Sequence, residues 1–177
     1  MGNAAWETEL RAVYDRGVEA WKMGRRSPGS MVTASDAAFL SEIGCSPQEL
    51  FDFVDDSLTY GEPDFDTVLA IQSLRRDHLL GVTGGAAVSR VTSMESLPSK
   101  SATLGGIAWL PRIIAKARLK LRGELPADLM FGCGGDREFV RSMGMSLPQF
   151  LKLVRDLDPD ETAILQAVQE TRGAASR

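Results

Sequence analysis

The residues best suited to chemistry lie in one run of five: Gly132, Cys133, Gly134, Gly135 and Asp136. Glycines just before a helix let several backbone N–H groups converge, and a helix N-terminus attracts anions. A thiol in that position ionises readily, which makes Cys133 a candidate nucleophile or redox thiol that Asp136 assists. The alternative is a purely structural helix start, in which Gly135 or Asp136 caps the helix and Cys133 packs as a small apolar residue.

A basic stripe precedes this run. Arg112, Lys116 and Lys120 are spaced four residues apart and therefore share one face of a helix. If that face meets the Cys133 loop, the two make a site for a small anionic ligand, with the Gly134–Gly135 backbone as further ligands. Trp109 would stack on the ligand or on Arg112. The alternative is a solvated helix face, with Trp109 in the core or in an interface.

For the other side chains that could do chemistry, the sequence favours structural roles. His78 is the only histidine, so a site with several histidine ligands is excluded and a Ser-His-Asp triad would have to include it. Grouped carboxylates, such as those of Asp52, Asp55 and Asp56, can bind a metal. The spacing of these three residues is also typical of a solvated helix face. We expect neither a metal nor a cofactor.

The elements that position these residues are helices, because apolar positions recur with helical spacing between capping residues. No segment shows sustained strand alternation, so the sequence predicts an all-α fold. The expected helices lie near 4–24, 36–43, 47–59, 65–80, 109–122, 136–143, 147–156 and 159–172.

Two segments of the chain resemble each other. Shifted by 100 positions, the chain gives six identities over the 21 positions from 36 to 56, where composition alone gives roughly one or two. Gly44 and Gly144 stand where a helix would end in the left-handed conformation. Ser46 and Ser146 stand where the next helix would begin, each with Glu or Gln three residues later as in a capping box. The pattern predicts two copies of one helical unit.

The predicted organisation is a first helical repeat over 1–80, a connection over 81–105 and a second helical repeat over 106–173. The connection is rich in Gly, Ser, Thr and Ala, which is typical of a flexible linker. Apolar residues recur within it, and a pure spacer would not need them. We therefore expect two pseudo-repeated helical lobes joined by a long, partly ordered connection.

A family resemblance enters at the second repeat. Leu-Gly-Gly stands at 104–106, Leu-Pro-Arg at 110–112 and Lys-Ala-Arg at 116–118, and Cys133 and Asp136 follow. The pattern resembles the bacterial domain-of-unknown-function 5069 family over about 97–172, and less specifically over 36–80. The pair 134–135 departs from the commoner pattern, which has bulkier residues there. The resemblance implies a helical bacterial protein and carries no established activity. It draws attention to Arg112, Lys116, Cys133 and Asp136.

Composition narrows the classes of function. Apolar residues make up 44% and charged residues 25% of the 177, which is an ordinary globular mixture. The net charge of −4 provides no overall basic field for nucleic acid. No apolar run approaches the roughly 20 residues that span a bilayer. The N-terminus lacks the pattern of a secretory signal, so we expect a cytoplasmic protein in which Cys45 and Cys133 are reduced.

Three hypotheses of function follow from the sequence. The first is a binding protein for a small anionic ligand near the Cys133 loop and the basic helix 111–122. The second is an enzyme in which Cys133 is a nucleophile or redox thiol, assisted by Asp136 or His78. The third is a protein-interaction or oligomerisation module, such as a homodimer, without catalysis. Nucleic acid and membranes are not expected partners.

Overall fold

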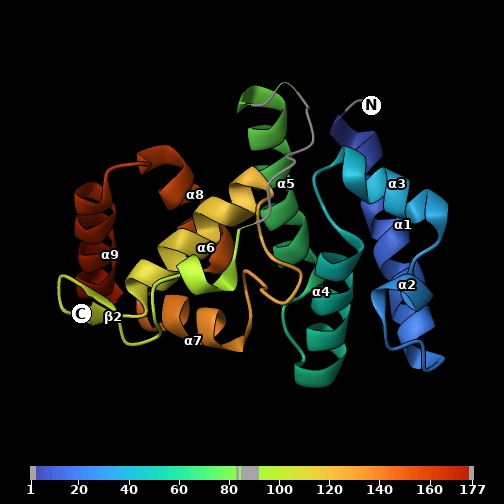
Figure 1. Cartoon of the computed structure of the whole chain (residues 1–177), viewed down its shortest axis with the longest axis horizontal. Coiled ribbons are helices and arrows are strands. Elements are labelled where there is room, and N and C mark those ends of the chain that lie inside the picture. Colours follow the sequence, from blue (N-terminus) through green and yellow to red (C-terminus); the bar gives the residue numbers. More distant parts are fainter. Residues whose placement is uncertain (1–2, 83, 85–91, 176–177) are drawn as a thin grey trace. The chain divides into compact units, whose positions relative to one another are not determined.

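The structure is a computed structural model that describes residues 3–82, 84 and 92–175. Its fold is all-α, as predicted, with one very short pair of strands in the described residues. The chain divides into two compact units, residues 1–87 and residues 88–177 (Figure 1).

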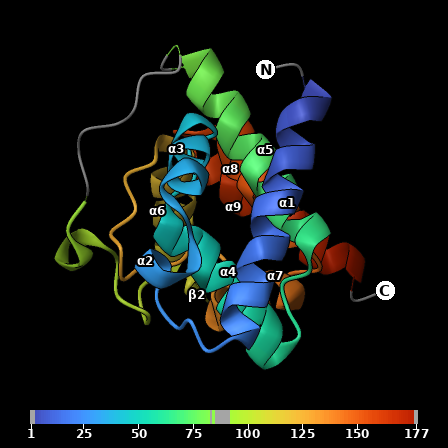
Figure 2. The same ribbon diagram turned by 90° about the vertical axis from the view of Figure 1, so that its right-hand side faces the viewer.

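The first unit contains the helices α1 (Asn3–Lys22), α2 (Pro28–Met31), α3 (Ala34–Glu42), α4 (Pro47–Tyr60) and α5 (Phe65–Val82). α1 runs alongside α4 and also contacts α2 and α5 (Figure 2). Its buried positions recur with helical spacing, and Leu10 and Val13 pack into the same core as Leu50, Phe53 and Ile71. Burial of this apolar face holds the helices together.

The second unit begins with a short 3-10 helix, Met94–Ser96, and a two-residue hairpin of β1 (Thr103–Leu104) and β2 (Ile107–Ala108). The helices α6 (Leu110–Arg122), α7 (Gly134–Ser142), α8 (Leu147–Leu157) and α9 (Glu161–Ala175) follow. α8 contacts all three of the other long helices. Its face of Phe150, Leu151 and Val154 is completely buried, which makes α8 the centre of this core.

The predicted helix–turn–helix signals are present in both units. Gly44 and Gly144 each have a φ of 73°, in the left-handed region that glycine adopts without a steric penalty. Ser46 and Ser146 each accept a hydrogen bond from the backbone three residues later, and both capping boxes are complete. Local residue chemistry therefore sets these helix ends.

Two predicted helix starts are displaced by two residues. α3 begins at Ala34 and α7 at Gly134, so Thr33 and Cys133 are the N-caps, and Asp36 and Asp136 occupy the third helical position. The expectation that Gly135 or Asp136 caps α7 is therefore wrong. The Thr-x-x-Asp spacing is itself a capping box, and this signal points to Thr33 rather than Asp36 as the cap.

The described part of the connection, residues 92–105, is structured. It includes the 3-10 helix and β1, and the N–H of Thr92 donates to the carbonyl of Glu124 at 3.0 Å. Residues 83 and 85–91, with Val88 and Val91, lie outside the described residues.

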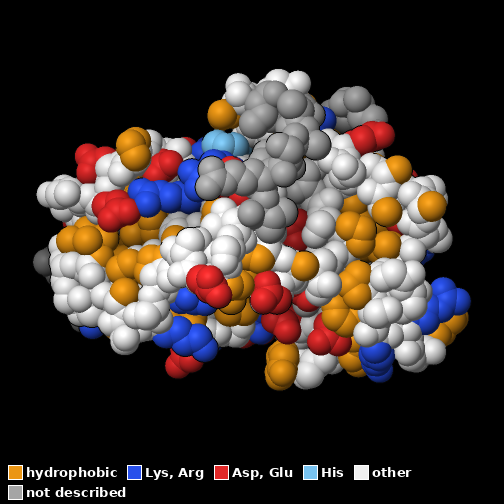
Figure 3. Space-filling view, in the orientation of Figure 1, with side chains coloured by type: hydrophobic (Ala, Val, Ile, Leu, Met, Phe, Trp, Pro, Cys, Tyr) orange, Lys and Arg blue, Asp and Glu red, His pale blue; other side chains and the backbone are white. Residues whose placement is uncertain are grey.

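On the face shown in Figure 3, acidic, basic and hydrophobic side chains are interspersed. In the described part of the chain, no helix combines the length and apolar character that crossing a bilayer requires.

Candidate functional site

Lys116 is the centre of the candidate site in the second unit. The expectation of a solvated stripe is wrong for two of its three residues, because Lys116 and Lys120 are each 1% exposed. Arg112 is only partly buried, and its guanidinium donates to the carbonyl of Pro98 at 2.7 Å. The predicted stripe is therefore not a single cationic surface.

The Lys116 ammonium makes two contacts inside the unit. It forms an ion pair with Asp136, and the two side chains are 2% and 0% exposed. It also donates to the sulfur of Cys133, with Nζ and Sγ 3.3 Å apart. A buried ammonium needs such partners, because removing it from water costs several kcal/mol. The structure thus brings the basic helix to the Cys133 loop through one lysine.

The Asp136 carboxylate is held on both oxygens. Oδ2 accepts from Lys116 and from the backbone N–H of Gly132 at 2.9 Å. Oδ1 accepts from the Trp109 indole N–H at 3.1 Å. Arg137, buried next to Asp136 in the sequence, donates to the Gly132 carbonyl at 2.7 Å and so fixes the loop that supplies this N–H. Asp136 therefore joins the start of α7 to the start and middle of α6.

Trp109 has an unusual backbone conformation. Its φ is 71°, and it is the one residue other than glycine with a positive φ in the described ranges. Such a conformation costs about 1–3 kcal/mol and persists only where the surroundings enforce it. Here its indole bonds Asp136, and its ring lies against Gly135, where an added Cβ would be 2.9 Å from Cζ2. Lys100 lies 5.9 Å from the ring centroid. Trp109 does not stack on Arg112 in these contacts; it positions Asp136.

Cys133 is partly exposed, whereas its partners are buried. It is the N-cap residue of α7, yet its side chain makes no capping hydrogen bond. Its sulfur instead accepts from Lys116. The exposed Gly134 is the first residue of α7. The thiol is therefore held between a buried ammonium and solvent.

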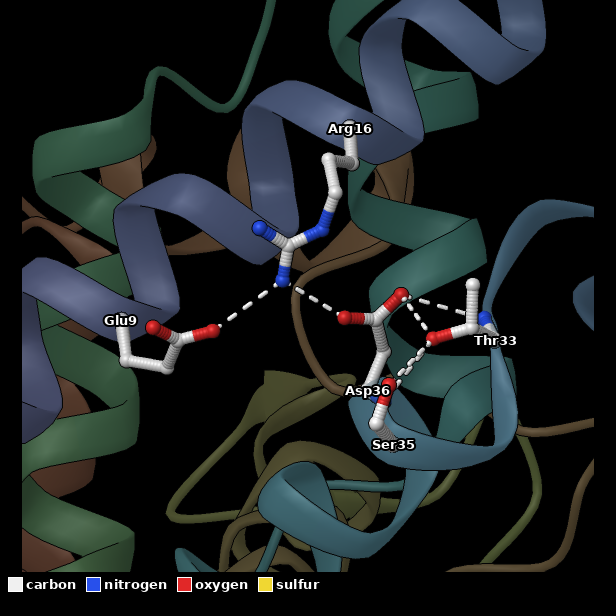
Figure 4. Close-up of polar contacts among 5 residues, drawn as sticks. All are labelled: Glu9, Arg16, Thr33, Ser35 and Asp36. Carbon is white, nitrogen blue, oxygen red and sulfur yellow. Dashed lines mark hydrogen bonds and ion pairs between the residues drawn. The ribbon is translucent and has the colours of Figure 1, made fainter.

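The first unit offers a comparison at positions 100 residues earlier. Figure 4 shows Arg16 of α1 between the carboxylates of Glu9 and Asp36, at 3.1 and 2.6 Å. The Thr33 hydroxyl contacts Asp36 and Ser35 and caps α3. Burial alone raises the pKa of Asp36, but hydrogen bonds from Arg16 and Thr33 outweigh it and hold that pKa below its usual value.

Both clusters pair a cation with an aspartate at the third position of a helix, but they differ in burial and chemistry. Arg16 is 48% exposed, whereas the Lys116 side chain is 2% exposed. The residues 100 positions apart in the sequence are Glu9 and Trp109, Arg16 and Lys116, Thr33 and Cys133, and Asp36 and Asp136. The first cluster is a capping box with a surface ion pair. The second replaces the capping hydroxyl by a thiol and buries the cation beside it.

Two residues of the site were not predicted. Arg137 donates to the carbonyl of Gly132, whose N–H bonds Asp136, and Pro98 accepts from Arg112. One sequence signal could have paired Lys116 with Asp136: they lie 100 residues after Arg16 and Asp36. This signal becomes informative only once the fold shows that Arg16 and Asp36 form an ion pair. Arg118, the last residue of the Lys-Ala-Arg run, bonds Asp158 and Glu161 at 2.6 and 2.7 Å and so ties α6 to the start of α9.

Other predicted sites lack a comparable arrangement. In the described part of the chain, no three His, Cys, Asp or Glu side chains are grouped to hold a metal. Asp55 accepts from the Trp21 indole at 2.7 Å and Asp52 from Gln48 at 2.7 Å, which are contacts within the first unit.

The fold and the site define an all-α protein of two helical units, of which the second carries a thiol beside a buried Lys–Asp pair. Residues 94–177, slightly less than half of the chain, match the model of the family "Domain of unknown function (DUF5069)". Neither curated proteins nor solved structures gave a match to the chain.

Proposed function

We propose that the second unit is a thiol-based redox module, in which Cys133 is a reactive thiol that Lys116 activates. One observation carries the proposal: the buried Lys116 Nζ lies 3.3 Å from the partly exposed Cys133 sulfur. The thiolate is the reactive form of cysteine, and an adjacent cation stabilises it. The reactants are small electrophiles and oxidants, such as hydrogen peroxide, that reach the sulfur from solvent.

The capping pattern supports this assignment. At the equivalent position, the Thr33 oxygen accepts from the Asp36 N–H at 3.1 Å and completes the start of α3. Cys133 makes no such bond, so its side chain is not needed to begin α7. The sulfur accepts a hydrogen bond from Lys116 and does not cap the helix, which favours a chemical role over a structural one.

A small anionic ligand at this loop is less well supported. The Lys116 charge is already paired with Asp136, and Arg112 bonds the Pro98 carbonyl. An incoming anion would compete with a buried carboxylate for the same ammonium.

Site-resolved alkylation of the full chain tests the proposal. Iodoacetamide is added at pH 7, and mass spectrometry follows Cys133 and Cys45 separately. Cys45 is 5% exposed and serves as an internal reference for opening of the fold. We expect Cys133 to react at least about tenfold faster than Cys45, because it combines exposure with a neighbouring cation.

The controls separate the effect of Lys116 from that of exposure. The charge-neutral double variant K116M/D136N should slow alkylation of Cys133 by about three- to tenfold, since it removes the cation. K116R retains the cation, as in the first unit, and should keep most of the rate. If the double variant folds and Cys133 reacts at the wild-type rate, Lys116 does not activate the thiol and the proposal fails.

A further inference from the structure

We infer that oxidation joins Cys133 to Lys116 through a reversible sulfur–nitrogen bond, which makes this pair a redox-controlled crosslink between α7 and α6. The inference rests on the proposed function, because it requires Cys133 to react with peroxide. Beyond that function, it names the oxidised product, a sulfur–nitrogen bond, and the residue that forms it with Cys133, which is Lys116. The juxtaposition of Cys133 Sγ and Lys116 Nζ at 3.3 Å carries it.

The first step is oxidation of the thiol by hydrogen peroxide. The sulfur attacks one peroxide oxygen, an S–O bond forms and the O–O bond breaks. The leaving hydroxide takes the thiol proton and departs as water. Sulfur loses two electrons to the peroxide, and the product is a sulfenic acid on Cys133. Sulfenic acids condense with nearby thiols or nitrogens.

The second step uses Lys116 and Asp136. The ammonium gives one proton to the Asp136 carboxylate with which it is paired. The free amine attacks the Cys133 sulfur, the S–N bond forms and the S–O bond breaks. The leaving hydroxyl takes a second proton from the nitrogen and departs as water. The residues together lose two hydrogen atoms, and no further reactant is needed.

Burial favours this product. Before the reaction, a lysine cation and an aspartate anion share a site in which their side chains are 2% and 0% exposed. Afterwards, the nitrogen and the carboxyl group are both neutral, so the site keeps its net charge and loses two buried ions. Trp109 and the Gly132 N–H still bond the Asp136 carboxyl group and keep it in position.

The geometry is specific to the second unit. The equivalent pair in the first unit is Thr33 with Arg16, neither of which forms such a bond. The other cysteine, Cys45, is buried, and its sulfur lies 3.6 Å from the Ser46 carbonyl oxygen.

The test treats the full chain with a small excess of hydrogen peroxide and analyses it by intact mass and peptide mapping. We expect a loss of two hydrogens, a linked peptide that joins Cys133 to Lys116, and return to the original mass with dithiothreitol. K116R should give no linked peptide. Its Cys133 should instead accumulate as a sulfenic acid that dimedone traps.

The outcomes separate the two proposals. If wild-type Cys133 is oxidised and trapped by dimedone without a link to Lys116, the reactive thiol stands and the crosslink is refuted. A two-hydrogen loss confined to Cys133 and the backbone nitrogen of Gly134 refutes the role of Lys116 in the same way. If Cys133 resists peroxide and Cys45 reacts as fast, both proposals fail.

Discussion

Replacing Lys116 with methionine tests whether a buried ion pair organises the second unit. Methionine fills the space of the lysine stem but has no charge. Asp136 would remain completely buried, with bonds from the Gly132 N–H and the Trp109 indole and no cation. The substitution therefore leaves one uncompensated charge inside the unit.

The magnitude follows from that burial. Removing one partner of a buried ion pair costs about 3–5 kcal/mol, because the other charge stays desolvated. Whole domains are stable by only about 5–15 kcal/mol. K116M should therefore consume a large share of the stability of the second unit and leave the first unit unaffected.

The chain supplies its own matched control. R16M removes the cation that pairs with Asp36 in the first unit, where the arginine side chain is 48% exposed and water can replace it. A solvent-screened pair of this kind is worth about 1 kcal/mol or less. The double variant K116M/D136N removes both members of the buried pair and should recover most of the loss, because Asp136 no longer leaves a carboxylate without its cation.

Amide hydrogen exchange measures each unit separately in the full chain. A loss of 3–5 kcal/mol lowers protection of the amides of α6 and α8 by roughly 10²- to 4 × 10³-fold, at about 1.4 kcal/mol for each factor of ten. R16M should change protection in α1 and α4 by about tenfold or less. If K116M costs no more than R16M, Lys116 is not a buried charged partner of Asp136 and the reasoning is refuted.

Two further predictions concern other contacts. G135A should destabilise the second unit by about 1–3 kcal/mol in urea unfolding, because its Cβ would lie 2.9 Å from Trp109. G134A, whose Cβ meets nothing closer than 3.8 Å, should be tolerated, and equal losses would contradict the packing argument. Burial raises the pKa of Asp52 from 3.8 to about 6, so the folded first unit binds a proton more tightly than the unfolded chain. The resulting penalty is absent below pH 3.8 and grows as the pH rises through 6. D52N should therefore stabilise the unit by about 1 kcal/mol at pH 7.5, after allowance for solvent screening, and hardly at all at pH 3.5. Equal effects at both pH values would refute this.

Local signals were sufficient to predict most of the fold. The ends of α4 and α8 follow from serine caps with a Glu or Gln three residues later, because a capping box needs only neighbouring residues. The left-handed Gly44 and Gly144 were predictable for the same reason. α3 and α7 begin two residues earlier than predicted. The prediction took the Asp at the third helical position for the N-cap, because Asp is also a common N-cap residue.

The candidate site depended on tertiary structure. A stripe of Arg112, Lys116 and Lys120 has the same spacing whether it faces water or a core, so the sequence predicted a shared face and not its burial. Burial of Lys116 depends on Asp136, which lies 20 residues later and places a carboxylate at the start of α7. Arg112 is diverted to the Pro98 carbonyl, and no local pattern encodes that contact. The sequence by itself determined which helices form, because caps and periodicity act over a few residues. Only the packing of α6 against the start of α7 placed a lysine beside a thiol, because desolvation of an ammonium depends on every group around it.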